Sequence, residues 1–139
     1  MRQALHRVDI PTRGKGLVMF TDTVRQWVAE TGIETGLLTI WCPHTSASLT
    51  VQENADPTVR EDIRRFFEAL VPEAPGRYIH DDEGPDDMPA HLRSMLTQTQ
   101  LSIPVADGQP VLGLWQGLYL FEHRRQPHRR QIVLHLIGE

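Results

Sequence analysis

Cysteine and lysine are almost absent from this sequence of 139 residues. Cys42 is the single cysteine, so the chain forms no internal disulfide, and we expect it to work in a reducing compartment such as the cytoplasm. Lys15 is the single lysine, beside thirteen arginines. Arginine suits phosphate and carboxylate groups, but such a bias also follows from genomic composition. The bias alone therefore identifies no ligand.

An excess of positive charge and long hydrophobic runs are also lacking. Acidic residues outnumber basic ones by 18 to 14, which argues against a general nucleic-acid-binding protein. No run approaches the roughly 18 apolar residues that a membrane-spanning helix needs. Residues 1–7 lack the apolar segment of a secretory signal. Hydrophobic residues make up 40% of the chain, so we expect a folded cytoplasmic protein that binds neither nucleic acid nor membrane.

Hydrophobic periodicity predicts strands toward both ends of the chain and helices in between. Alternating or continuous apolar runs predict strands at 5–10, 36–42, 46–51, 101–105, 111–121 and 130–137. This order is typical of an α+β protein with a mostly antiparallel sheet and two or three helices. The length indicates a single small domain, residues 1–139.

Capping residues mark the starts of the predicted helices. Thr21 is the expected N-cap of a helix that ends at Gly32 or Gly36. The pair Asp56-Pro57 predicts the start of an amphipathic surface helix that ends near Pro72. A third helix, 89–97, is expected to turn Leu92, Met95 and Leu96 inward.

The first candidate functional segment follows Pro43, where the chain leaves a predicted strand. Functional side chains are common at such places, so His44 is a candidate, although a histidine bonded to a turn is the simpler interpretation. Glu53 and Asn54 come just before the helix that Asp56 is expected to cap. The free N–H groups at that helix start would attract an anion.

The second segment is a loop rich in proline and glycine at residues 72–88, and loops of this length are often functional. Five acidic and no basic residues lie between Tyr78 and His91. Crowded carboxylates repel one another, so either a divalent cation or free solvation must stabilise them. His80 and His91 bracket the loop, and with His44 they supply the three imidazoles of a zinc-type catalytic site. Their spacings of 36 and 11 residues match no local metal motif.

The third segment contains Gly113–Gly117 and an arginine-rich turn. Trp115 and Gln116 are expected to point to opposite faces of a strand, with the tryptophan most simply in the core. Four arginines lie between residues 124 and 130. They would bind phosphate well, but they equally suit a solvated hairpin tip.

These motifs occur together in one known family. The chain contains in order the runs 43–50 (PHTSASLT), 53–57 (ENADP), 80–81 (HD), 83–84 (EG), 87–91 (DMPAH), 113–117 (GLWQG) and 138–139 (GE). With them it resembles the secondary thiamine-phosphate synthase (YjbQ-like) family over essentially its whole length. Leu114 and Gln100 depart from the threonine and serine that are usual there, so functions of those hydroxyl groups are in doubt.

The resemblance implies a small α+β fold, a homotrimer, and a pocket near subunit contacts that holds a metal or phosphate. Members are credited with a low thiamine-phosphate synthase activity. The positions that match the family pattern are His44, Glu53, Asn54, Asp56, His80, Asp81, Glu83, His91, Trp115, Gln116 and Arg130.

Three functions remain as alternatives. The first is a transferase that joins hydroxymethylpyrimidine pyrophosphate to thiazole phosphate and releases pyrophosphate, with Asp81, Glu83 and Asp87 as the candidate magnesium ligands. The second is a zinc-type hydrolase, and the third is a protein that binds metal or phosphate without catalysis. The expected cofactor is a divalent metal, zinc or magnesium, and the expected partner is a phosphorylated small molecule.

Each candidate residue has an expected role. The catalytic candidates are His44, Glu53, Asp81 and Glu83. The candidates for substrate or phosphate binding are Ser46, Asn54, Asp56, Trp115, Gln116 and Arg130. The metal candidates are His44, His80 and His91.

Overall fold

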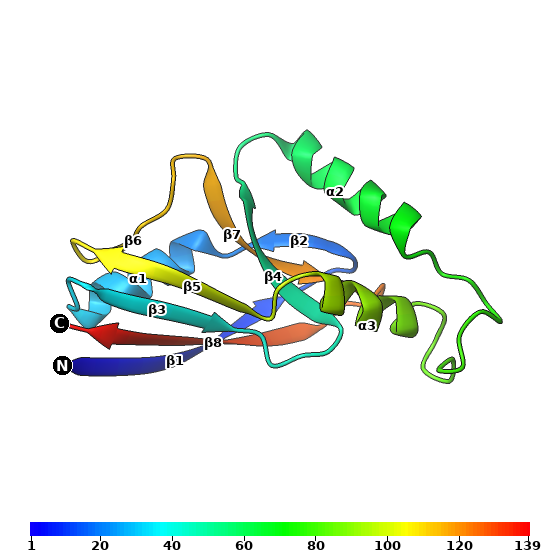
Figure 1. Ribbon diagram of the computed structural model, residues 1–139, viewed down its shortest axis with the longest axis horizontal. Helices are drawn as coiled ribbons and strands as arrows, with labels where there is room; N and C mark the ends of the chain where they lie inside the picture. Colours follow the sequence, from blue (N-terminus) through cyan, green and yellow to red (C-terminus); the bar gives the residue numbers. More distant parts are fainter.

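A computed structural model describes residues 1–139 and contains two antiparallel sheets and three helices (Figure 1). The larger sheet has the strand order β1 (Arg2–Pro11), β8 (Arg129–Gly138), β3 (Gly36–Trp41), β5 (Gln100–Ala106) and β6 (Gln109–Pro110). The smaller sheet has the order β2 (Gly16–Met19), β7 (Gln116–Glu122) and β4 (Ala47–Glu53). The structure confirms the predicted α+β class and the small antiparallel domain.

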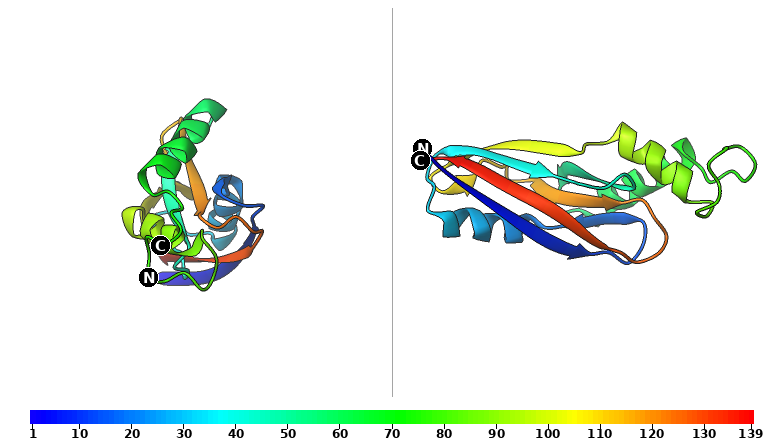
Figure 2. Two further views of the ribbon diagram at one scale, coloured as in Figure 1. Left: turned by 90° about the vertical axis from the view of Figure 1, so that its right-hand side faces the viewer. Right: turned by 90° about the horizontal axis from the view of Figure 1, so that it is seen from below.

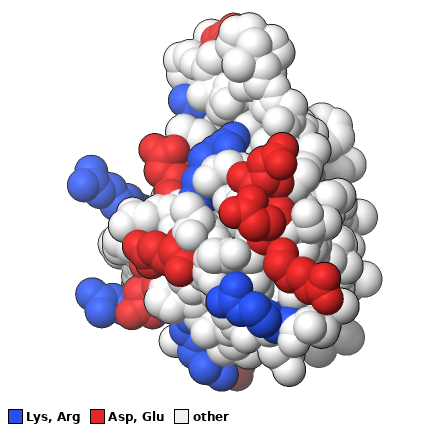
Figure 3. Space-filling view, turned by 90° about the vertical axis from the view of Figure 1, so that its left-hand side faces the viewer, with Lys and Arg blue, Asp and Glu red and all other residues white.

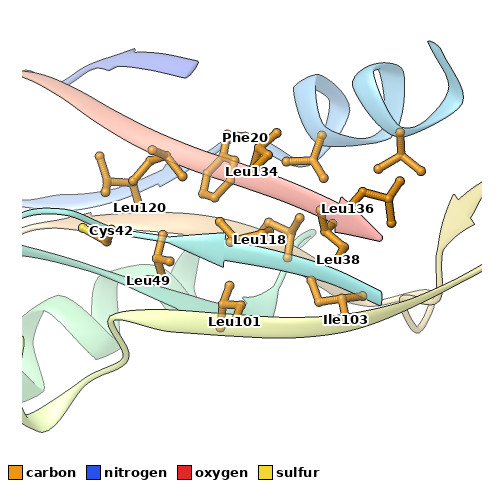
Figure 4. Packing of buried hydrophobic residues seen from close by; sticks show 14 of the residues in the cluster. Phe20, Leu38, Cys42, Leu49, Leu101, Ile103, Leu118, Leu120, Leu134 and Leu136 are labelled. Carbon is orange, nitrogen blue, oxygen red and sulfur yellow. The ribbon is translucent and has the colours of Figure 1, made fainter. Parts of the chain in front are cut away.

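The hydrophobic core lies between the two sheets, as the side chains in Figure 4 show. Side chains alternate along strand β8, where Ile132, Leu134 and Leu136 are fully buried. Strand β7 is buried on both faces. Leu118 and Leu120 belong to the core cluster, whereas Tyr119 and Phe121 lie outside it.

Helix α1 (Thr21–Thr31) packs Val24 and Val28 into this core. Thr21 is not its N-cap, contrary to the prediction: Phe20 holds that position, and the Thr21 hydroxyl accepts a hydrogen bond from the Leu118 N–H at 2.8 Å. The helix ends at Gly32, whose φ of 74° is the left-handed conformation that glycine adopts most easily.

Helix α2 (Pro57–Leu70) lies on the side of the molecule opposite the larger sheet (Figures 1 and 2). The Asp56 carboxylate caps it by accepting the Thr58 N–H, as predicted. Phe67 meets Phe121 edge to face at 5.3 Å, so the helix covers the outer side of β7. No residue of α2 is fully buried, and Phe66 of its apolar stripe is 59% exposed.

Helix α3 (Asp87–Leu96) turns a different face inward than predicted. Met95 and Leu96 are 79% and 60% exposed, so their inward placement is wrong. The buried residues of the helix are Asp87, Pro89, Ala90 and Arg93. The charged members are buried because they have partners, such as the Val71 carbonyl that accepts from Arg93 Nη2 at 2.9 Å.

The predicted strand 111–121 is only half correct. Strand β6 ends at Pro110, residues 111–115 form a loop, and β7 begins at Gln116. Trp115 consequently lies outside the sheet and is 60% exposed, so its expected core position is wrong.

The two termini lie together at one end of the molecule, where the Met1 ammonium is 3.6 Å from a Glu139 carboxylate oxygen. Acidic and basic side chains are intermixed on this end (Figure 3). The loop between α2 and α3 lies at the opposite end (Figure 2, right). None of the helices combines the length and apolar character needed to cross a membrane.

Candidate metal centre

Four side chains from the α2–α3 loop and helix α3 converge at the end of the molecule away from the termini. Their potential ligand atoms all lie within 4.8 Å of one another. The group consists of His80, Glu83, Asp87 and His91. Asp87 and His91 are four residues apart on α3, a spacing that places them on the same face of the helix. The loop brings His80 and Glu83 to that face.

Asp87 is at the centre of the group. Its Oδ2 atom is 2.6 Å from Nε2 of His80 and 3.1 Å from Nε2 of His91. Nε2 of His80 is also 3.1 Å from a carboxylate oxygen of Glu83. Asp87 is buried, whereas His80 and Glu83 are exposed, so one side of the group is open to solvent.

Hydrogen bonds outside the group fix the orientation of its members. Nδ1 of His91 donates to the Thr45 carbonyl at 2.9 Å, and Nε2 of the same ring is hydrogen-bonded to Asp87 Oδ2 at 3.1 Å. An ion bound beside Asp87 would replace the proton on Nε2. Metal-binding histidines commonly use their second ring nitrogen as Nδ1 is used here. The other oxygen of Asp87, Oδ1, accepts a hydrogen bond from Arg124 Nη1 at 2.7 Å.

The side chains of the group also shift each other's protonation. The hydrogen bond to Asp87 raises the pKa of His80, because it stabilises the imidazolium. Burial alone would raise the pKa of Asp87, but hydrogen bonds with His80 and Glu83 and the charge of Arg124 lower it overall. Asp87 is therefore an anion at neutral pH, as a metal ligand must be.

Two imidazole nitrogens and two carboxylate oxygens form a donor set that fits a divalent metal. The two carboxylates balance the charge of such an ion. Imidazole ligands favour zinc and other transition metals, whereas magnesium prefers oxygen ligands and water. Of the two metals expected from the sequence, this set suits zinc better.

His44 lies outside the group, although the sequence analysis placed it there. Its Nε2 accepts a hydrogen bond from the Gln131 N–H at 3.0 Å, so that lone pair is engaged by the backbone. Burial and the nearby Arg130 lower the pKa of His44. His44 and His91 both line an open cavity of about 520 Å³, together with Trp41 and Met95.

Glu53, Asn54 and Asp56 lie in a different place and stabilise local structure. One Glu53 carboxylate oxygen accepts the backbone N–H groups of Ala55 and Asp56, at 2.8 and 2.7 Å. The Asn54 amide donates to the carbonyls of Leu114 and Gln116. These bonds shape the α2 start and the exposed loop that carries Trp115.

The expected phosphate ligand Arg130 is engaged inside the protein, and two of its neighbours in the arginine-rich turn also have carboxylate partners. Arg130 is 6% exposed, and its guanidinium donates to both carboxylate oxygens of Glu122 and to the Ser46 hydroxyl. Arg124 pairs with Asp86 and Asp87, and Arg125 pairs with Glu73. Arg129 is the most exposed arginine of the turn, with its Nη1 3.8 Å from Asp9 Oδ2. Arg130 is therefore not a free phosphate ligand.

Two residues of the site were underestimated from the sequence. Asp87 was considered only as an oxygen ligand for magnesium, although its spacing of four residues from His91 is a usable signal on a predicted helix. Arg124 was grouped with its neighbours in a turn, and no sequence signal shows that it reaches the loop before α3. Asp81, a predicted catalytic residue, is exposed and outside the group.

The fold and the site together define a class: small α+β proteins with two antiparallel sheets and an imidazole–carboxylate cluster at one end. The chain belongs to the UPF0047 protein YjbQ-like family, whose sequence pattern matches residues 6–139.

Relatives of known sequence and structure support this assignment. UPF0047 protein sll1880 of Synechocystis is 49% identical over 138 residues, covering 99% of this chain and 94% of the relative. UPF0047 protein YjbQ of Escherichia coli O157:H7 is 44% identical, covering 95% of this chain and 96% of the relative. The crystal structure of a YjbQ/UPF0047 family protein of Clostridium acetobutylicum is 30% identical, with a TM-score of 0.87 and coverage of 95% and 99%.

Proposed function

We propose that this protein is a metal-dependent enzyme acting on a phosphorylated small molecule. One observation carries the proposal: His80, Glu83, Asp87 and His91 converge within 4.8 Å on a solvent-open side of the molecule. The nearby cavity of about 520 Å³ shares His91 with this group, and its size is in the range of small-molecule sites.

A divalent ion in this group would supply positive charge for a phosphate or pyrophosphate group of the substrate. Arg124, Arg125 and Arg130 do not provide that charge, because each is paired with a carboxylate. Asp87 and His91 are held by Arg124 and Thr45. Glu83 is exposed and would complete the ligand set on the solvent side of the group, beside His80, Asp87 and His91.

The family resemblance supports a transferase, which would join hydroxymethylpyrimidine pyrophosphate to thiazole phosphate. In that reaction the thiazole nitrogen bonds to the pyrimidine methylene carbon, and pyrophosphate leaves with the electron pair of the broken C–O bond. Trp41 of the cavity is 45% exposed and offers an aromatic surface for a heterocyclic ring.

The two imidazoles favour a zinc-type phosphoester hydrolase as a second candidate. Zinc hydrolases use mixed histidine and carboxylate ligands and keep one position for water. The group already offers four ligand atoms, so the water would bind in addition to them, from the solvent-exposed side.

We further propose that the chain forms a homotrimer in the cytoplasm. The outer face of the larger sheet supports association, because Leu37, Trp41 and Ile137 are 40–46% exposed there. Light scattering tests the proposal: the trimer requires three times the 15.9 kDa chain mass, and a monomer at micromolar concentration contradicts it.

Metal titration tests the central proposal. We expect the purified protein to bind about one Zn²⁺ per chain and to bind Mg²⁺ much more weakly. His80→Ala, Asp87→Asn and His91→Ala should each lose Zn²⁺, whereas His44→Ala should retain it. Retention by all three ligand variants would rule out this centre.

Activity assays then separate the two reactions. The zinc-loaded protein is given hydroxymethylpyrimidine pyrophosphate with and without thiazole phosphate. Thiamine phosphate formation supports the transferase, and phosphate release without thiazole phosphate supports the hydrolase. Turnover that is equal in wild type and Asp87→Asn would contradict both.

A further inference from the structure

Arg124 lies just beyond the end of strand β7 and reaches the loop that leads into helix α3. Its guanidinium donates three hydrogen bonds to this short stretch: Nε to Asp86 Oδ2 at 3.0 Å, Nη1 to Asp87 Oδ1 at 2.7 Å, and Nη2 to the Glu83 carbonyl at 2.9 Å. Two of the three acceptors belong to residues of the candidate metal centre. Arg124 itself contributes no ligand atom.

The bond to Arg124 gives the two carboxylate oxygens of Asp87 different partners. Oδ1 faces Arg124, so only Oδ2 faces the imidazoles of His80 and His91, at 2.6 and 3.1 Å. A carboxylate fixed at one oxygen offers the other in a defined direction. The bond therefore sets how Asp87 presents itself to an ion.

The bond to the Glu83 carbonyl acts on the backbone of the second loop ligand. The chain turns at Gly84, whose φ of +102° is left-handed, and then enters α3. Arg124 spans this turn from Glu83 to Asp87. Asp86 adds a separate attachment, because its Oδ2 also accepts the Arg125 N–H at 2.9 Å. The loop thus keeps an anchor that does not depend on the Arg124 side chain.

We propose that Arg124 is a positioning residue for this centre: its three-way hydrogen bonding holds Glu83 and Asp87 in the arrangement that binds a divalent cation. The inference rests on the proposed metal-dependent function. Arginine suits this task because its planar donors point in fixed directions, whereas lysine places three donors around one atom and cannot span these acceptors.

Arg124 could affect metal binding through its charge or through the positions of the ligands. The two effects have opposite signs, so affinity measurements separate them. A positive charge beside a cation site repels the cation, and removal of Arg124 by electrostatics alone would tighten metal binding. If Arg124 positions the ligands, its removal weakens binding. Arg124→Lys keeps the charge and loses the geometry, so it should weaken binding only if geometry matters.

The neighbouring Arg125 provides a matched control. Its side chain pairs with Glu73, away from the ligands, and its contact with Asp86 uses only the backbone N–H. Arg125→Gln therefore removes the same charge from an adjacent position and leaves the loop bonds intact.

The experiment measures Zn²⁺ affinity at pH 7 by competition with a chromophoric chelator, for wild type, Arg124→Gln, Arg124→Lys and Arg125→Gln. We expect both Arg124 variants to bind Zn²⁺ about 10- to 100-fold more weakly, and Arg125→Gln to bind at least as tightly as wild type. The visible spectrum of bound Co²⁺ should change in Arg124→Lys, because the ligand geometry changes, and should remain unchanged in Arg125→Gln.

The outcomes distinguish the positioning role of Arg124 from the existence of the metal centre. Equal or tighter binding by both Arg124 variants overturns the positioning role while the metal centre stands. Failure of wild type to bind Zn²⁺ overturns the metal centre and the positioning role together. Far-ultraviolet circular dichroism establishes that the variants compared are folded. If Arg124→Gln does not fold, the Zn²⁺ affinity of Arg124→Lys alone tests the positioning role.

Discussion

Ser48 and His123 share a hydrogen bond of 2.8 Å in the interior, where both side chains are at most 1% exposed. Thr97 Oγ1 lies 2.6 Å from the Ser48 hydroxyl and 2.8 Å from the Arg93 carbonyl. A carbonyl only accepts and each hydroxyl donates once, so Thr97 donates to Arg93, Ser48 to Thr97, and His123 Nε2–H to Ser48. This order leaves Nδ1 of His123 unprotonated and without a partner.

His123 should make the protein less stable in acid. Burial, followed by the charges of Arg93, Arg130 and Lys15, lowers the pKa of His123 from 6.5 to about 3. Below pH 6.5 the unfolded chain takes up a proton at this histidine and the folded chain does not. The free energy of unfolding therefore falls by up to about 1.4 kcal/mol per pH unit between pH 6.5 and pH 3, and this part is fully retained above pH 6.5.

Urea denaturation between pH 7 and pH 4 measures this effect in His123→Gln. In a plot of the free energy of unfolding against pH, the variant should have a slope smaller than that of wild type by the amount that one bound proton contributes. Ser48→Ala is the control: it removes the acceptor of a buried N–H, which costs about 1–3 kcal/mol, but it keeps the imidazole and hence the slope. The same slope in wild type and His123→Gln would refute the argument.

The sequence predicted the elements whose signal is local. Strand β8 alternates buried and exposed side chains, and Asp56-Pro57 marks the first turn of α2. Residues 111–115 are also apolar enough to suggest a strand, but the Asn54 amide holds them as a loop from about sixty residues away in the chain. Such a partner leaves no trace in the local pattern.

The contrast between local signals and distant partners also explains which residues of the candidate site were predicted. His80 and His91 were identified because they bracket one acidic loop, and both belong to the observed group. His44 was added from a segment far away in the chain, and no sequence spacing could show that the Gln131 backbone binds it. Helix α3 turns Arg93 inward for a similar reason, since its partner, the Val71 carbonyl, lies in another segment.

Asn54 should control the order of the loop that carries Trp115. Its side chain donates to the carbonyls of Leu114 and Gln116 at 3.1 and 3.3 Å, and its N–H donates to the Trp115 carbonyl at 3.1 Å. Asn54→Ala keeps only the last of these bonds. We expect faster amide hydrogen exchange in residues 112–116 and a loss of about 1–2 kcal/mol in stability.

The matched control is Gln52→Ala, in an exposed residue of the neighbouring strand β4. Exchange in residues 112–116 should be unchanged in that variant. Equal exchange in Asn54→Ala and wild type would show that the loop is held by other contacts.

Arg130 should matter for stability through its buried partner. Glu122 is fully buried and accepts from Arg130, from the Thr12 hydroxyl and from the His123 N–H. Arg130→Met removes the cation and leaves a buried carboxylate, so we expect a loss of about 3–5 kcal/mol in the free energy of unfolding. The double variant Glu122→Gln/Arg130→Met should lose less than the sum of the two single variants.

Chemical denaturation of the four proteins in this cycle gives the interaction energy of the pair. Additive losses would show that the two side chains do not stabilise each other. Phosphate affinity provides a second readout: it should be nearly the same in wild type and Arg130→Met, because the Arg130 guanidinium is paired with Glu122.

Gly138 allows the last residue of strand β8 to lie against the first residue of strand β3, Gly36. A Cβ atom on Gly138 would lie 2.1 Å from the Thr35 carbonyl oxygen and 2.6 Å from the Gly36 Cα. These obstacles are backbone atoms, which a rotamer change cannot move. Gly138→Ala should therefore lower the free energy of unfolding by at least the roughly 1–3 kcal/mol typical of overpacking.

Gly113→Ala tests whether the effect is specific to this contact. A Cβ atom there would meet only the flexible Gln116 side chain, at 3.4 Å, and the bond from the residue 113 N–H to that side chain remains possible. Thermal unfolding should show a clear drop in Tm for Gly138→Ala and little change for Gly113→Ala. Equal Tm values for both variants would mean that the β3–β8 contact can open without cost, which the close backbone approach at Gly36 argues against.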